Sequence, residues 1–283
     1  MTEGLKILYV ILRRKPKNRK VVQRMDSPLT PALSLLTRVR KSAFTLAEVL
    51  VTLGIIGIVA AMTLPMLAKN YQQYVLLQQF KKAYATIAIA SQKTQIDMGE
   101  GVKCFYYKNK YGYDAHGVGN WTDCDYFFSE FVKNLKISKI CEGDALEGKC
   151  IPKDMRGGEK VYAEVQGGDD KQAAEEQFER GCKGFMTNSI QNFSQVYVVN
   201  SGFTIIRYNT GAVRGYAPLF VVDVNAHKGP NKWGYDIYVL EFDKSTKKDS
   251  VFNVIGASHC APLDYGGVYA KDVITYLYPH ASL

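Results

Sequence analysis

Residues 49–68, VLVTLGIIGIVAAMTLPMLA, decide the fold, because these 20 positions contain no charged side chain. As an α-helix rising about 1.5 Å per residue, they span the roughly 30 Å hydrocarbon layer of a membrane. Residues 71–98 then repeat apolar side chains at spacings of three and four, which predicts one amphipathic stripe. We therefore expect a single helix from Thr45 to Met98, with its second half packed on a globular head.

Two sequence features are expected to bend or end this predicted helix. Pro65 lacks a backbone N–H and its ring clashes with the preceding turn, so we expect a kink or a local loss of helix there. The run Gly99-Glu100-Gly101 provides a plausible stop. The helix is expected to end there, where the head begins.

Positive charge is concentrated before the helix. Residues 1–43 hold 11 Lys and Arg against 2 Asp and Glu, and because the whole chain carries +9, the remaining residues are neutral overall. A basic segment before a membrane span holds the N-terminus in the cytoplasm and places the following residues outside. The neutral body gives no support for a nucleic-acid partner.

The cysteines agree with this topology. All six lie after residue 100 and none forms a C-x-x-C pair: Cys104, Cys124, Cys141, Cys150, Cys182 and Cys260. An even number without metal-type spacing favours disulfides in an oxidising compartment over free buried thiols. The full connectivity stays open, and the short spacing favours Cys141 with Cys150 as a local pair.

Residues 41–50, KSAFTLAEVL, resemble the processing site of type IV pilins and of the pseudopilins of type II secretion systems. The resemblance implies that a prepilin peptidase cuts between Ala43 and Phe44 and that the new α-amine of Phe44 is methylated. Glu48 stands at the position of the family's glutamate, whereas Ala43 replaces the usual glycine. The implied fold is pilin-like: a long N-terminal helix packed on an antiparallel sheet.

Glu48 can be interpreted physically as well. A carboxylate in an apolar run costs on the order of 2.5 to 3.5 kcal/mol on insertion scales, so it needs a partner. After cleavage, the Phe44 ammonium of an axially staggered neighbouring chain is a suitable partner, which makes Glu48 a register device for assembly. The alternative is an ordinary signal peptide that is cut after Ala61. In the apolar region of such a peptide, a glutamate at position 48 would have no function.

These signals predict four segments. Residues 1–43 form a basic cytoplasmic leader that is removed, residues 44–68 a transmembrane helix, residues 69–98 its amphipathic continuation, and residues 99–283 an exported head with disulfide-pinned insertions. Translation from Met25 would give a shorter leader. We expect a single-pass protein of the inner membrane, with its head periplasmic or extracellular and a place in a surface filament after assembly.

The head is expected to add a sheet, giving an α+β fold. Four runs predict strands of an antiparallel meander: residues 193–199, 203–208, 218–224 and 235–242. A short helix is expected at residues 126–135. Residues 157–181 are polar and are expected to form a solvated face or a flexible loop, with a short helix that is capped by Asp169 or Asp170 and ends at Arg180.

The last two predicted strands are joined by a run of Asp, Asn, Pro and Gly, residues 223–236, DVNAHKGPNKWGYD. It resembles a motif of many pseudopilin-like proteins. Asp223, Asn225, Asn231 and Asp236 offer the hard oxygen ligands that calcium prefers, although the spacing is not that of an EF-hand. The alternative is a loop closed by Asx-turns and Pro-Asn turn chemistry, which needs no metal.

No motif of a catalytic centre is found in the sequence, and none of the four histidines stands in a metal-ligand pair, so we expect no enzyme. The resemblance implies a structural subunit of a type IV pilus, type II secretion or DNA-uptake filament. Its partners would be other pilin-like subunits, the prepilin peptidase, an inner-membrane assembly platform and the lipid bilayer. The alternative is a minor or tip subunit whose head binds DNA, a glycan or a secreted substrate.

Overall fold

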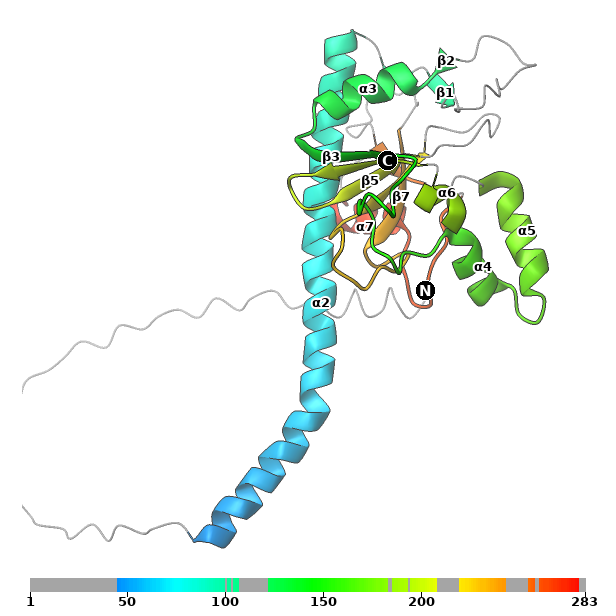
Figure 1. Ribbon diagram of the computed structural model, residues 1–283. Helices are drawn as coiled ribbons and strands as arrows, with labels where there is room; N and C mark the ends of the chain where they lie inside the picture. Colours follow the sequence, from blue (N-terminus) through cyan, green and yellow to red (C-terminus); the bar gives the residue numbers. More distant parts are fainter. Residues whose placement is uncertain are drawn as a thin grey trace, which may run out of the picture. The chain divides into compact units, whose positions relative to one another are not determined.

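The computed structural model describes residues 45–99, 101–102, 104–106, 122–182, 185–192, 194–207, 219–242, 254–257 and 260–279. The described chain divides into two compact units, and the division falls between Gln72 and Gln73. The first unit is the beginning of the long helix. The second contains the rest of that helix and every strand (Figure 1).

Helix α2 (Leu46–Met98) has 53 residues and follows the predicted bounds closely. It ends where Gly99 adopts a left-handed φ of 71° and donates its N–H to the carbonyl of Ile96. The helix is unbroken at Pro65, so the predicted local loss of helix is absent. A proline withholds only one backbone N–H, so the other hydrogen bonds of the helix continue past it, and the alternative effect, a kink, stays a prediction.

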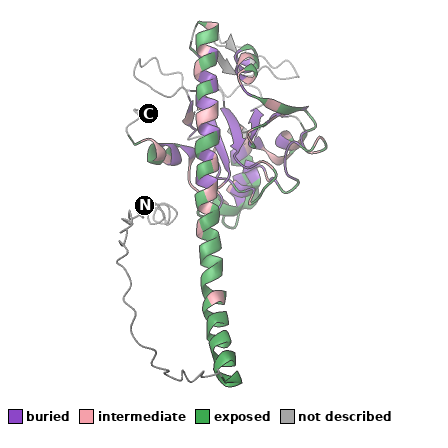
Figure 2. Ribbon diagram, turned by 90° about the vertical axis from the view of Figure 1, so that its left-hand side faces the viewer, coloured by how far each residue is buried: buried purple, intermediate pink, exposed green. Residues whose placement is uncertain are grey.

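The two parts of α2 differ in their surroundings, as Figure 2 shows by colour. Within the first unit, nearly every residue is exposed. This part contains the described chain's one helix segment that is long and apolar enough to cross a membrane. The second part buries one stripe against the sheet: Leu76, Leu77, Phe80, Ala83, Tyr84, Ile87, Ala88, Ala90, Ser91 and Thr94.

The stripe of α2 is joined to the last strands of the sheet by two tyrosine contacts. The rings of Phe80 and Tyr238 meet edge to face with their centroids 4.6 Å apart. The hydroxyl of Tyr84 donates to the carbonyl of Val254 at 2.7 Å. Because Tyr238 and Val254 lie on neighbouring strands, these contacts fix the second part of α2 on the sheet.

The described sheet has six antiparallel strands in sequence order, from β3 to β8. Their bounds are β3 (Ile137–Glu142), β4 (Gln195–Val199), β5 (Thr204–Arg207), β6 (Leu219–Asp223), β7 (Ile237–Phe242) and β8 (Val254–Gly256). Strands β5 and β6 are buried at every position, which means that both faces of the sheet are covered. The four predicted strands correspond to β4, β5, β6 and β7, and β3 and β8 extend the meander at its two edges.

The remaining elements surround this sheet. They are a short parallel pair of β1 (Cys104–Tyr106) with β2 (Thr122–Asp123), and the helices α3 (Asp125–Lys133), α4 (Gly158–Gln166), α5 (Lys171–Cys182), α6 (Thr187–Asn192) and α7 (Ala270–Leu277). Helix α3 is the one predicted after residue 125, and its Phe127, Phe128 and Phe131 pack on Phe242. Helix α7 packs against β7 and β8.

The prediction for residues 157–181 is correct in part. The predicted short helix is α5, and Asp170 caps its start by accepting the N–H of Ala173 at 3.0 Å, but Gly158–Gln166 forms a second helix that was not predicted. This stretch forms α4 and most of α5, and α4 buries Val161 and Ala163. A Cβ on Gly158 would lie 2.4 Å from the ring of Phe178, so glycine allows the two helices to approach closely. Gly158, one of the glycines that suggested a loop, therefore serves helix packing.

Two disulfides are described with both of their partners. Cys141 of β3 is bonded to Cys150, the pair that the short spacing favours, and Cys182 at the end of α5 is bonded to Cys260. Cys124 is disulfide-bonded as well, and none of the cysteines that the structure describes is free. The preference for disulfides over free thiols is confirmed for these positions.

Candidate functional site

The start of α2 is closed by a reciprocal pair of side-chain contacts between Thr45 and Glu48. The backbone N–H of Thr45 donates to Glu48 Oε2 at 2.8 Å, and the Thr45 hydroxyl donates to the same oxygen at 2.9 Å. In return, the N–H of Glu48 donates to Thr45 Oγ1 at 3.2 Å. This is a capping box, which satisfies backbone donors at a helix start.

The capping box gives Glu48 a partner within its own chain, which the sequence interpretation had not included. The signal was present, because Thr45-Leu46-Ala47-Glu48 has the Thr-x-x-Glu spacing of a capping box. Both described contacts end on Glu48 Oε2. Ala43 and Phe44, the predicted processing site, lie outside the described residues.

The second candidate site is the loop between β6 and β7, which we call the cation loop (residues 223–236). The four predicted ligand residues are all between 0% and 6% exposed: Asp223, Asn225, Asn231 and Asp236. The N–H of Val224 donates to the carbonyl of Asp236 at 2.9 Å, which closes the loop at its base. All four residues are therefore buried within one closed loop, although the sequence spreads them over 14 positions.

Asp236 organises the interior of the cation loop. One carboxylate oxygen accepts the N–H of Asn231 at 2.8 Å and an N–H of the Asn225 amide at 3.2 Å, and the other accepts the N–H of Lys232 at 2.7 Å. Asn231 has a left-handed φ of 52°, a conformation that asparagine tolerates well. This part of the loop follows the prediction of a self-capped turn.

Three other oxygens of the cation loop are buried and have no hydrogen-bond partner among the residues that the structure describes. They are Asp223 Oδ2, Asn225 Oδ1 and Asn231 Oδ1. Leaving a buried acceptor unpaired costs about 1 to 3 kcal/mol, and more for a charged group. Carboxylate and amide oxygens of this kind are the ligands that calcium takes.

The electrostatics of the cation loop also favour a bound cation. Burial raises the pKa of Asp223 well above its usual value, and the negative charges of Asp236 and Asp154 raise it further. Burial also raises the pKa of Asp236, partly offset by the hydrogen bonds that its carboxylate accepts. A bound divalent cation would compensate both carboxylates for their loss of hydration.

No three carboxylate, imidazole or thiol groups form a ready-made metal centre in the part of the chain that the structure describes. A site in the cation loop would therefore depend on amide and backbone oxygens beside two carboxylates. Calcium, which takes six to eight oxygens in flexible geometry, suits such a set better than a transition metal does.

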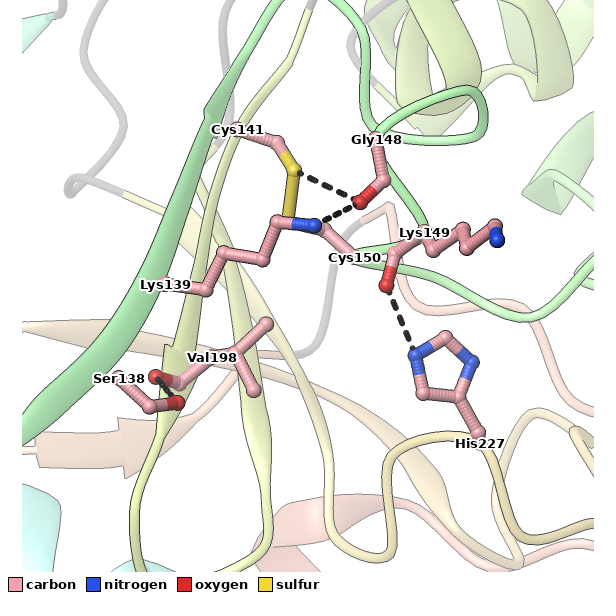
Figure 3. The surroundings of a disulfide bond; sticks show 8 residues. All are labelled: Ser138, Lys139, Cys141, Gly148, Lys149, Cys150, Val198 and His227. Carbon is pink, nitrogen blue, oxygen red and sulfur yellow. Dashed lines mark hydrogen bonds between the residues drawn. A yellow bond between two sulfur atoms is a disulfide. The ribbon is translucent and has the colours of Figure 1, made fainter.

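Residues outside the predicted motif also contact the cation loop. The carboxylate of Asp154 accepts the Asn231 amide N–H at 2.7 Å. The ring of His227 lies 3.0 Å from the carbonyl of Lys149, next to the disulfide of Cys150 (Figure 3). The sequence alone gave no signal for these contacts, because Asp154 and Asn231 are 77 positions apart.

Comparison with known proteins gives one match. Residues 38–64 match the model of the prokaryotic N-terminal methylation motif. No curated protein and no solved structure matches the chain. The matched segment covers the predicted cleavage junction, Glu48 and most of the apolar run. The chain thus carries at its N-terminus the signature of type IV pilins and pseudopilins, which prepilin peptidase processes.

Proposed function

We propose that the protein is a structural subunit of a type IV pilin-like filament, used in a pilus, in type II secretion or in DNA uptake. The matched methylation motif is the observation that carries this proposal. The precursor is inserted with its leader, residues 1–43, in the cytoplasm and its head outside. Prepilin peptidase cuts before Phe44, and the assembly platform extracts the helix from the bilayer.

The exposed part of α2 supplies the assembly surface. Its apolar side chains are exposed in the single chain, including Leu50, Ile55 and Ile58, so they are available to lipid before assembly and to neighbouring helices afterwards. Small residues at Gly54 and Gly57 have open space around them, which allows close approach of another helix. The Glu48 carboxylate then forms an ion pair, through Oε1, with the Phe44 ammonium of a neighbouring chain.

The mature N-terminus tests the proposed processing. The full chain is expressed with a prepilin peptidase and, as a control, with a catalytically inactive peptidase, and the membrane-extracted protein is examined by mass spectrometry. We expect a methylated Phe44 terminus with the active peptidase and an intact leader with the inactive one. A terminus at Met62 would establish an ordinary signal peptide instead.

The head has a second proposed function, which is calcium binding by the cation loop. The observation that favours it is the set of three buried oxygens without partners: Asp223 Oδ2, Asn225 Oδ1 and Asn231 Oδ1. With Asp236 they provide two carboxylates and two amides. A calcium ion would supply the positive charge that balances the two carboxylates. A bound calcium ion would stabilise the loop that connects β6 and β7.

Thermal melts of the full chain in detergent test calcium binding. At a calcium concentration 100 times the dissociation constant, binding adds about 2.7 kcal/mol to the free energy of unfolding, which raises the melting temperature. Asp223→Ala should abolish the difference between calcium and chelator. Superimposable wild-type melts would leave the self-capped turn as the correct interpretation, and a calcium effect that survives Asp223→Ala would place the ion elsewhere.

A further inference from the structure

Residues 149–156, the stretch around Cys150, lie along the cation loop. Three hydrogen bonds join the two: Asn231 Nδ2 to Asp154 Oδ1 at 2.7 Å, Trp233 Nε1 to the carbonyl of Arg156 at 2.9 Å, and the His227 ring with the carbonyl of Lys149 at 3.0 Å. Only the first of them involves a side chain whose other polar atom is a candidate cation ligand.

The Asn231 amide has a donor side and an acceptor side, and the structure fixes which side faces which neighbour. Its Nδ2 donates to Asp154, and its Oδ1 is buried without a partner. A carboxylate only accepts hydrogen bonds, so Asp154 selects the NH₂ side of the amide. If the amide turned over, its NH₂ would replace its oxygen among the buried groups of the cation loop, and a cation would lose a ligand.

We propose that Asp154 is a positioning residue of the cation site, whose carboxylate holds the Asn231 amide with Oδ1 directed to a calcium ion. This inference rests on the proposed calcium binding and adds to it a residue from outside the C-terminal motif. Asp154 itself is exposed, so its carboxylate keeps its hydration and needs no cation of its own.

The backbone around Asp154 is anchored independently of Asn231. Ile151 and Met155 on either side are both buried, and the N–H of Met155 donates to the carbonyl of Pro152 in a turn. Cys150 is tied to β3 by its disulfide. The Asp154 carboxylate is therefore presented at a fixed place before any cation binds, which is what a positioning group requires.

The test compares three variants of the full chain in detergent by calorimetric titration with calcium chloride. Asp154→Asn provides an amide that can donate as well as accept, so it no longer selects one orientation of Asn231. Asp154→Glu restores a group that only accepts. Asp144→Asn is the matched control, because it removes the same charge from an exposed aspartate ten residues earlier.

We expect Asp154→Asn to raise the calcium dissociation constant about 10- to 100-fold, the range typical of groups that orient metal ligands. Asp154→Glu and Asp144→Asn should stay within a few-fold of wild type, and the melting temperature of all variants in chelator should match wild type. A merely structural Asp154 would instead lower the melt in chelator.

Wild-type affinity for calcium in Asp154→Asn would overturn the positioning role while leaving calcium binding intact. So would a loss of affinity in Asp154→Asn that Asp154→Glu fails to restore, or an equal loss in Asp144→Asn. If wild type itself shows no heat of calcium binding, the proposed cation site fails, and the role of Asp154 fails with it.

Discussion

Glu48 combines a local contact with a proposed one between chains, and a single substitution separates them. Glu48→Gln keeps an oxygen that accepts from Thr45 but removes the charge that would pair with an ammonium. We expect Glu48→Gln to be processed normally and to enter filaments as poorly as Glu48→Ala, measured by the amount of subunit in sheared filaments.

The head provides the control for this prediction. Glu48 lies outside the second unit, so neither substitution should change the melting temperature of the head. Incorporation of Glu48→Gln at wild-type levels, with Glu48→Ala excluded, would show that the capping box is sufficient and the ion pair unnecessary. Wild-type incorporation of both would remove the register role altogether.

Asp264 supports the cation loop from the side of the C-terminal segment. One oxygen accepts the backbone N–H of Trp233 at 2.8 Å, and the other pairs with Arg156 at 2.5 Å. Asp264→Ala leaves the buried Trp233 N–H without a partner, and we expect it to lower the free energy of unfolding by about 1 to 3 kcal/mol, measured by urea denaturation.

Glu164→Ala is the matched control for Asp264→Ala. Glu164 pairs with the same arginine at 2.5 Å, but its side chain is 52% exposed. Exposed ion pairs contribute about 0 to 1 kcal/mol, so the loss should be much smaller. Equal losses in the two variants would mean that the arginine, and not the Trp233 N–H, carries the effect.

At the scale of elements, the Cys141–Cys150 and Cys182–Cys260 disulfides close loops of very different length. Cys182 and Cys260 are 78 positions apart, whereas Cys141 and Cys150 are 9 apart. Cross-links that close longer loops restrict the unfolded chain more, with about 3 kcal/mol for a loop of roughly 15 residues and about 4.7 for roughly 100. We expect Cys182→Ser/Cys260→Ser to lower the melting temperature more than Cys141→Ser/Cys150→Ser.

Both double variants should be melted in chelator, so that any effect on the cation loop is absent from the comparison. A larger loss for the Cys141–Cys150 pair would indicate that anchoring the edge strand β3 matters more for stability than loop length. The measurement thus separates an effect on the unfolded chain from one on the sheet.

At the scale of the whole molecule, the division of the chain at Gln73 makes a prediction about solubility. Residues 45–72 are exposed and mostly apolar, whereas the buried stripe of α2 begins at Leu76. A chain starting at Gln73 should therefore remain in aqueous buffer without detergent and melt cooperatively. The full chain should require detergent.

A chain starting at Ala88 is the control, because it lacks Phe80 and Tyr84, which contact the last strands of the sheet. It should aggregate or lose its cooperative melt. If the chain starting at Gln73 behaves no better, the first part of α2 contributes to the fold of the head.

The sequence by itself determined the long helix, the methylation motif and the central strands. These signals are local: an uncharged run of membrane length, a short motif around the cleavage junction, and short runs of mostly apolar residues in β4 to β7. It did not predict β3, whose central residues Ser138 and Lys139 are exposed at the edge of the sheet. It also did not predict α4, because a glycine that permits close helix packing, as Gly158 does, cannot be told from a loop glycine until the partner helix is known.

For the candidate site, the sequence identified Asp223, Asn225, Asn231 and Asp236 as a set with two interpretations. Only the tertiary structure decided which backbone N–H groups donate to the Asp236 carboxylate and which oxygens of the loop lack a partner among the described residues, because hydrogen-bond partners depend on how the loop closes. Only it brought Asp154 to Asn231, since a contact across 77 positions depends on the packing of segments that no local pattern encodes.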